Sequence, residues 1–245
     1  MNPSRSSYQS LFQFLLVTIF FISLGGESGW AQTRHLSSRS AVVADERLAV
    51  LRAAPQFYAP FLRRIGRGRI VTLLEAQRSS DGAVFYRVAV TRRTRGWLQR
   101  EAVVVPSRAG DDARLLALIK ASRDFDRLAR ARIFLDVFPR SSLRAAVLLL
   151  FGDEAEKTAA KLSREALRRL DPIEMSATEA SLASYFLNYS GLDRYRKQGI
   201  IFTFDDTTHQ FQYDGNVWRE LLRKHGQSPE AAIVRARRNR VGSRR

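Results

Sequence analysis

The feature that most constrains the fold is a change of hydrophobic period near residue 110. Before it, short β-branched and aromatic runs alternate with turn residues, which is typical of β-strands. From Asp111 onward, apolar residues recur at the spacing of helices that bury one face. The predicted strands are Leu48–Arg52, Arg69–Leu74, Val84–Val90, Thr94–Leu98 and Ala102–Val105. The chain should therefore be α+β and multidomain, with a β part over residues 41–106 and a helical part over residues 110–234.

The predicted strands are short, and this limits how the β part can close. Five such strands cannot cover two large sheet faces, so we expect them to curl into a small closed or nearly closed barrel. Turns at Gly66-Arg67-Gly68, Ser79–Gly82 and Arg92-Arg93 separate the strands. A barrel of this size has a marginal core for a domain that folds alone.

Four segments of the β part resemble bacterial Src-homology-3-like domains in their order and spacing. These segments are Leu48–Pro55, Gly66–Val71, Phe85–Val88 and Gly96-Trp97-Leu98. The resemblance implies a small barrel whose surface loops bind peptide or cell-wall ligands through aromatic and polar residues. The chain departs from the family at Leu51, which is larger than usual, and at Phe57-Tyr58, which enlarge the first loop.

Cap and stop residues divide the chain beyond the β part into helices. Asp111 and Asp112 can cap a first helix, and Asp124 can cap a second that Pro139 stops. Ser141 or Ser142 can cap a third helix, which Gly152 could interrupt. The helix-turn-helix pattern around Pro139 resembles the tetratricopeptide-like helical hairpins of exported bacterial proteins, which implies an irregular α-hairpin domain.

Residues 201–213 break the helical pattern. Aromatic residues alternate with other residues on both sides of an Asp- and Thr-rich turn, which predicts a β-hairpin inserted between helices. A two-stranded hairpin is marginal by itself, so its aromatic face should pack on the helical domain.

The first 31 residues have the pattern of a signal peptide. Arg5 precedes the apolar run Leu11–Leu24, and the small residues Gly29 and Ala31 fit cleavage after Ala31. An uncleaved anchor is the alternative, but the run is shorter than the roughly 20 apolar residues of a spanning helix. We therefore predict a periplasmic or secreted protein with no transmembrane segment in the mature chain.

Charge is distributed unevenly along the chain, which carries 41 Lys and Arg against 24 Asp and Glu, a net +17. Residues 40–106 contribute +7 and residues 235–245 contribute +6, whereas residues 107–234 contribute only +2. Such a field attracts anionic polymers or lipid headgroups. Nucleic acid would be attracted by the same charges, but export removes that partner. The end of the chain, residues 235–245, is predicted to be a basic disordered tail.

Candidate binding residues come from the two basic regions and from the aromatic residues of the β part. Only five of the basic residues are Lys, so an Arg-favouring genome also explains the composition. For ligand binding we select Phe57, Tyr58, Tyr86 and Trp97, although Trp97 could instead fill the barrel core. For contacts with an anionic surface we select Arg92, Arg93, Arg95, Arg235, Arg237, Arg238 and Arg240.

The residue types exclude several kinds of chemistry. The chain has no cysteine, which excludes disulfides, thiolate metal sites and a Cys nucleophile. The sequence signatures of serine hydrolases, zinc proteases and phosphate-binding loops are also absent from it. Asp205, Asp206 and His209 could form an acid–base or metal site, but an ordinary hairpin turn uses the same residues. We expect no cofactor and no metal.

Together these features predict a non-catalytic exported envelope protein. Its barrel would bind peptidoglycan or another anionic envelope polymer, and its helical domain would bind protein partners. One alternative is an envelope hydrolase with an Asp/His site in the 201–213 hairpin. Another is a purely structural barrel packed on the helices.

Overall fold

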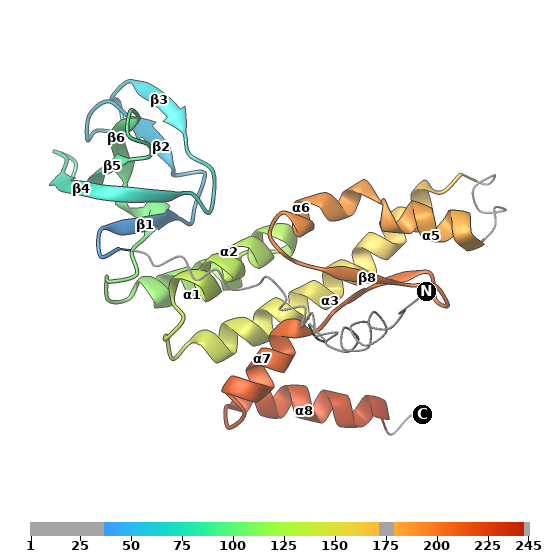
Figure 1. Ribbon diagram of the computed structural model, residues 1–245. Helices are drawn as coiled ribbons and strands as arrows, with labels where there is room; N and C mark the ends of the chain where they lie inside the picture. Colours follow the sequence, from blue (N-terminus) through green and yellow to red (C-terminus); the bar gives the residue numbers. More distant parts are fainter. Residues whose placement is uncertain (1–36, 172–178, 243–245) are drawn as a thin grey trace, which may run out of the picture. The chain divides into compact units, whose positions relative to one another are not determined.

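The first part of the chain folds into a seven-stranded antiparallel sheet in the computed structural model, which describes residues 37–171 and 179–242 (Figure 1). The predicted signal peptide lies outside the described residues. The strand order is β3-β2-β6-β5-β4-β1-β7. The strands are β1 (Ser40–Val43), β2 (Val50–Arg52), β3 (Phe61–Arg64), β4 (Ile70–Arg78), β5 (Val84–Ala89), β6 (Arg95–Gln99) and β7 (Val103–Val104), with a short helix η1 (Arg100–Ala102) before β7.

The sheet contains all five predicted strands and two that were not predicted, β1 and β3. Its edge strands β3 and β7 do not pair with each other among the described strands, so the predicted closure into a small barrel is wrong. Strand β1 extends the sheet by pairing with both β4 and β7, and β7 then has no second partner among the described strands. The sheet is therefore open, with β3 as one edge.

Strand β1 joins the core of the sheet to the core of the helical part. Successive side chains of a strand point to opposite faces. Ala41 and Val43 pack in a core between the strands, whereas Val42 and Ala44 pack in the core that also contains the helices. The β part and the helical part therefore share buried surface, and the described residues form one compact unit.

The second part of the chain is helical, so the prediction of an α+β chain is confirmed. The helices are α1 (Asp111–Ala121), α2 (Asp124–Val137), α3 (Arg144–Arg169), α5 (Glu179–Leu187), η2 (Ser190–Leu192), α6 (Asp193–Arg196), α7 (Asn216–Lys224) and α8 (Pro229–Gly242). Helices α1 and α2 begin at Asp111 and Asp124, but their N-caps are Gly110 and Arg123 and neither N-cap residue makes a side-chain capping hydrogen bond, so the predicted caps are wrong. Helix α2 ends before Pro139, as predicted. Gly152 does not interrupt α3, which continues as one helix to Arg169.

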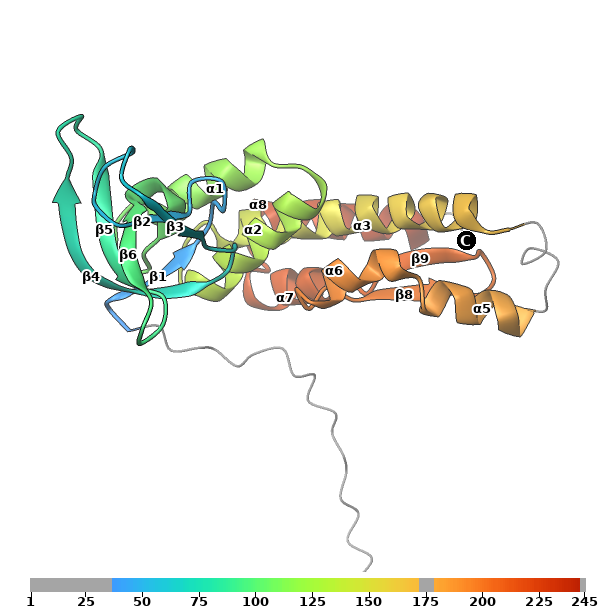
Figure 2. The same ribbon diagram turned by 90° about the horizontal axis from the view of Figure 1, so that it is seen from above.

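The predicted β-hairpin is present as β8 (Phe202–Asp205) and β9 (Gln210–Tyr213), which lie along α3 (Figure 2). The backbone N–H of Phe211 donates to Ser163 Oγ of α3 at 2.8 Å. The ring of Phe204 stacks on Phe186 of α5 with centroids 4.5 Å apart. The hairpin thus buries its aromatic face against the helices, as predicted.

Helix α8 extends into the region predicted to be a disordered tail. Ala231 and Val234 bury its inner face, and Arg237 pairs with Asp153 of α3. These contacts hold the segment in a helix, so the prediction of disorder is wrong for residues 235–242. Residues 243–245 lie outside the described residues. Among the described helices, none combines the length and apolar character needed to cross a bilayer.

The ion pair that joins α3 to α7 leads to a pH prediction. Glu220 accepts from Arg144 at 2.7 Å. Burial raises the pKa of Glu220, but Arg144 and Lys224 together outweigh burial and lower the pKa overall. A lowered folded-state pKa stabilises the protein above the ordinary glutamate pKa of about 4.3, and this stability is lost as the pH falls through both values. We expect Glu220→Gln to lower the free energy of unfolding by about 1–2 kcal/mol at neutral pH, with a smaller loss in acid.

Denaturant unfolding at several pH values measures this difference. Glu165→Gln is the matched control on α3, because Glu165 has no ion pair among the described residues. A loss in Glu220→Gln that does not shrink in acid would contradict the assignment.

Candidate functional site

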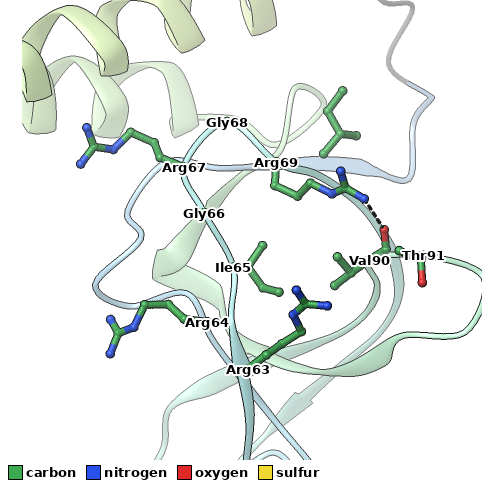
Figure 3. Close-up of a pocket in the computed structure, with 10 residues that line it drawn as sticks. Arg63, Arg64, Ile65, Gly66, Arg67, Gly68, Arg69, Val90 and Thr91 are labelled. Atoms are coloured by element: carbon green, nitrogen blue, oxygen red, sulfur yellow. Dashed lines mark hydrogen bonds between the residues drawn. The ribbon is translucent and has the colours of Figure 1, made fainter. Parts of the chain in front are cut away.

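The best candidate for a functional site is an open cavity of about 700 Å³ beside the turn that joins β3 to β4 (Figure 3). It is lined by residues 63–70 together with Val90 and Thr91 from the turn between β5 and β6. Gly68 has a φ of +77°, which favours glycine at this turn, and its N–H donates to Val43 O at 2.8 Å. The buried Ile65 anchors the segment in the core of the sheet.

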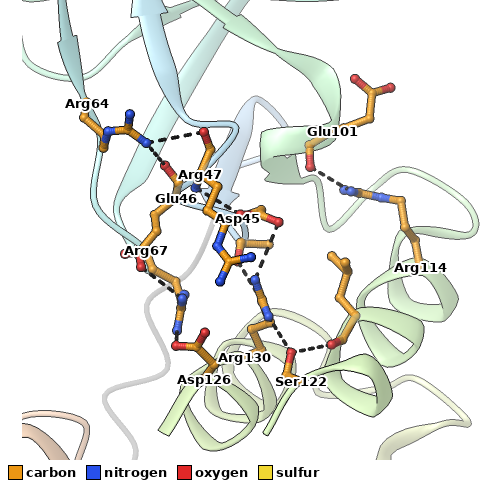
Figure 4. A network of polar contacts seen from close by, with 12 residues as sticks. Asp45, Glu46, Arg47, Arg64, Arg67, Glu101, Arg114, Ser122, Asp126 and Arg130 are labelled. Carbon is orange, nitrogen blue, oxygen red and sulfur yellow. Dashed lines mark hydrogen bonds and ion pairs between the residues drawn. The ribbon is translucent and has the colours of Figure 1, made fainter.

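Arg67 is one of four arginines that line the cavity, and it has a structural role. Its side chain is only 9 % exposed and pairs with Glu46 at 3.1 Å and with Asp126 of α2 at 2.9 Å (Figure 4). Burial raises the pKa of Asp126, but Arg67, with smaller contributions from Arg130 and Arg47, outweighs burial and lowers the pKa overall. The charge of Arg67 is therefore neutralised within the protein.

The other three arginines of the cavity have no carboxylate partner among the described residues. Arg69 donates to Val90 O at 3.3 Å, and Arg64 donates to the backbone carbonyls of Glu46 and Arg47 at 3.4 Å. Arg63 has no hydrogen bond or ion pair within the described part of the chain. In Figure 3, Arg63 and Arg69 extend to the same side of the segment, toward Val90, while Arg64 points away.

The predicted surface arginines of the β part lie next to this cavity in the chain. Arg92 and Arg93 form the exposed turn that follows Thr91, and Arg95 begins β6. Thr91 Oγ1 accepts from the backbone N–H groups of Arg93 at 3.3 Å and of Thr94 at 3.0 Å, which shapes the turn. None of these three arginine side chains has an ion pair among the described residues.

The C-terminal arginines lie on a different element. Helix α8 packs on α3 and α7. On α8, Arg235 and Arg238 are exposed, and Arg237 pairs with Asp153 of α3. Arg240 lies near the end of the same helix. The structure therefore divides the predicted anion-binding arginines into a group on the sheet and a group on α8.

The four predicted ligand-binding aromatic residues do not form one site. Tyr86 stands opposite Leu98, and Arg87 stands opposite Trp97, so Tyr86 and Trp97 point to opposite faces of the sheet. Arg108, which precedes α1 in the chain, donates a hydrogen bond from Nη1 to the Tyr86 hydroxyl at 2.6 Å. Trp97 is 8 % exposed, so it is an interior residue rather than the surface contact selected from the sequence. Its size and apolar ring explain this burial.

Phe57 and Tyr58 remain at the surface, in the loop between β2 and β3. Phe57 is 38 % exposed and packs edge-on against Phe85, with ring centroids 5.3 Å apart. Tyr58 is 95 % exposed. Phe61 and Leu62 on edge strand β3 are also exposed, so an apolar surface adjoins Arg63 along the chain. Phe61, Leu62, Arg63 and Arg69 were not among the residues predicted to bind a ligand, although the four arginines in residues 63–69 were an available signal.

The alternative Asp/His site has the contacts of a hairpin turn. Asp205 accepts from the N–H groups of Thr207 and Thr208 and from Gln212 Nε2. The hydrogen bonds from Thr208 are the main reason that the pKa of Asp205 is lowered, which disfavours a general acid. No group of three potential metal ligands occurs within residues 37–171 and 179–242.

Comparisons with protein-family models, with curated proteins and with solved structures give no significant match to this chain.

Proposed function

We propose that this chain is a non-catalytic, exported envelope protein that binds cell-wall or other anionic polymer through its sheet. The observation that carries the proposal is the basic cavity, where Arg63, Arg64 and Arg69 lack a carboxylate partner among the described residues. Uncompensated positive charge attracts polyanions and is screened by salt. The proposed periplasmic or secreted location rests on the sequence pattern of residues 1–31.

We also propose that the sheet is related to bacterial Src-homology-3-like domains, although it is open. The support is the order of β2, β4, β5 and β6, which carry the four resembling segments. The helices, which we propose to be tetratricopeptide-like, would bind protein partners. The exposed apolar side chains Leu167, Leu187 and Ile201 are available on this part of the chain for such contacts.

One observation favours the alternative of a purely structural sheet. Arg67 joins the sheet to Asp126, and Arg130 of α2 pairs with Asp45 at 3.5 Å (Figure 4). These ion pairs dock the sheet on the helices. They leave Arg63 and Arg69 unused, so docking and polymer binding are compatible.

Sedimentation with purified peptidoglycan sacculi tests the proposal. We expect the full chain to be retained without dissolving the sacculi, and added salt to release it. Loss of turbidity that Asp206→Ala abolishes would instead support the hydrolase. Absence of retention at low salt would contradict polymer binding and leave the structural alternative.

Removing the exposed ring of Tyr58 is expected to weaken retention on sacculi by about three- to tenfold. Tyr58 is almost fully exposed, so Tyr58→Ala should leave the melting temperature unchanged. Leu187→Ala on α5 is the matched control, because Leu187 is also exposed. If Phe57→Ala and Tyr58→Ala leave retention intact while deletion of residues 235–245 removes it, the loop is not the contact surface.

A further inference from the structure

The two guanidinium groups of Arg63 and Arg69 face the same cavity and carry two positive charges toward it (Figure 3). Like charges that converge repel each other, and no carboxylate of the described residues compensates these two. Arg67, from the same segment, shows the contrast, since two carboxylates neutralise it. The charge that these two side chains carry is therefore available to an anionic ligand.

The size and lining of the cavity indicate what kind of anion would fit. Its volume of about 700 Å³ lies within the usual range of about 300–1,000 Å³ for organic ligands and greatly exceeds the space of a single oxyanion. The partly exposed Ile70 and Val90 supply apolar surface beside the arginines. The ligand should therefore have a charged group and a larger organic body.

The charge of the site favours phosphate over carboxylate. A phosphate monoester carries about −1.5 to −2 at neutral pH, which matches two arginines, whereas a carboxylate carries only one negative charge. Planar guanidinium forks bind phosphate oxygens in a bidentate manner. The hydrogen bond from Arg69 to Val90 O already orients one of the two groups at the cavity.

We infer that Arg63 and Arg69 form a binding site for a phosphate monoester group carried on an organic body. The inference deepens the proposed function and rests on it for the choice of an anionic ligand. The phosphate monoester can belong to a soluble phosphate ester or to the headgroup of phosphatidic acid. Both sources present the same monoester phosphate to the two arginines.

Titration of the full chain with glycerol 3-phosphate, followed by calorimetry, tests the inference. We expect Arg63→Gln/Arg69→Gln to weaken binding by at least about tenfold, because two charge-assisted contacts are lost. Arg123→Gln/Arg223→Gln is the matched control. It removes the same charge from exposed arginines on the helical part whose side chains lack ion pairs among the described residues. Glycerate, the carboxylate analogue, should bind more weakly than glycerol 3-phosphate.

Vesicles of phosphatidylcholine with or without phosphatidic acid separate the two sources. Binding of either glycerol 3-phosphate or phosphatidic acid vesicles that depends on Arg63 and Arg69 supports the inference and identifies the source. Equal losses in the test and control variants would overturn it, as would equal binding of glycerate or absence of binding to both phosphate probes. Because all four arginines are exposed, matching melting temperatures confirm that the variants fold.

Sacculus retention of the same variants keeps the two proposals apart. Retention by a chain that binds neither phosphate probe would overturn the phosphate site and leave polymer binding intact. Phosphate binding by a chain that sacculi do not retain would support the phosphate site and overturn polymer binding.

Discussion

Asp111→Ala is expected to lower the free energy of unfolding by about 3 kcal/mol. Asp111 is 3 % exposed and accepts from the N–H of Val105 at 2.7 Å, from Arg108 Nε at 2.8 Å and from Arg114 Nε at 3.4 Å. The substitution leaves a buried N–H unpaired and removes the counter-charge of two arginines where the sheet meets α1. Denaturant unfolding measures the loss.

Two variants sharpen this prediction. Asp111→Asn keeps an acceptor for Val105 but removes the charge, so we expect a smaller loss. Asp206→Ala, at an exposed turn position, should change stability by less than about 0.5 kcal/mol. If Asp111→Ala is as mild as the Asp206 control, Asp111 does not join the two parts of the chain.

Gly152→Ala is expected to lower the free energy of unfolding by about 2 kcal/mol. A Cβ at this position would lie 2.7 Å from Cδ1 of Trp218 and closer still to its Nε1. The rigid indole of α7 would have to move away from α3. The higher helix propensity of Ala, about 1 kcal/mol, offsets only part of this cost.

A double-mutant cycle tests the cause. In a Trp218→Ala background, Gly152→Ala removes no space from a neighbour, so it should be neutral or stabilising by up to about 1 kcal/mol. Thermal or denaturant unfolding of the four proteins gives the coupling. An equal loss in both backgrounds would show that the close approach of Trp218 is not why α3 contains glycine here.

The sequence predicted the elements whose patterns are local. Short β-branched and aromatic runs between turn residues predicted β2, β4, β5, β6 and β7, alternation predicted the inserted hairpin, and Pro139 predicted the end of α2. Strand β1 was missed because it is short and its pairing partners, β4 and β7, are distant in the sequence. Strand β3 was missed because all four of its residues are exposed.

The candidate site was predicted only in part. The excess of positive charge in the β part was evident, as were Arg92, Arg93, Phe57 and Tyr58. The cluster of four arginines in residues 63–69 is a local signal, but it does not distinguish Arg63 and Arg69 from Arg67, which two carboxylates neutralise. The register of β5 against β6 places Tyr86 and Trp97 on opposite faces of the sheet, and this register was not predicted from the sequence.

By itself, the sequence determined where strands give way to helices and where positive charge concentrates, because periodicity and charge are local properties. The tertiary structure alone decided which arginines remain free. Arg67 is neutralised by Glu46 and by Asp126, which lie 21 and 59 residues away, whereas Arg63, four residues earlier, meets no carboxylate among the described residues. Ion pairing depends on groups that folding brings together from distant positions. The cavity is basic because, within the described part of the chain, folding brings carboxylates to Arg67 and not to Arg63 or Arg69.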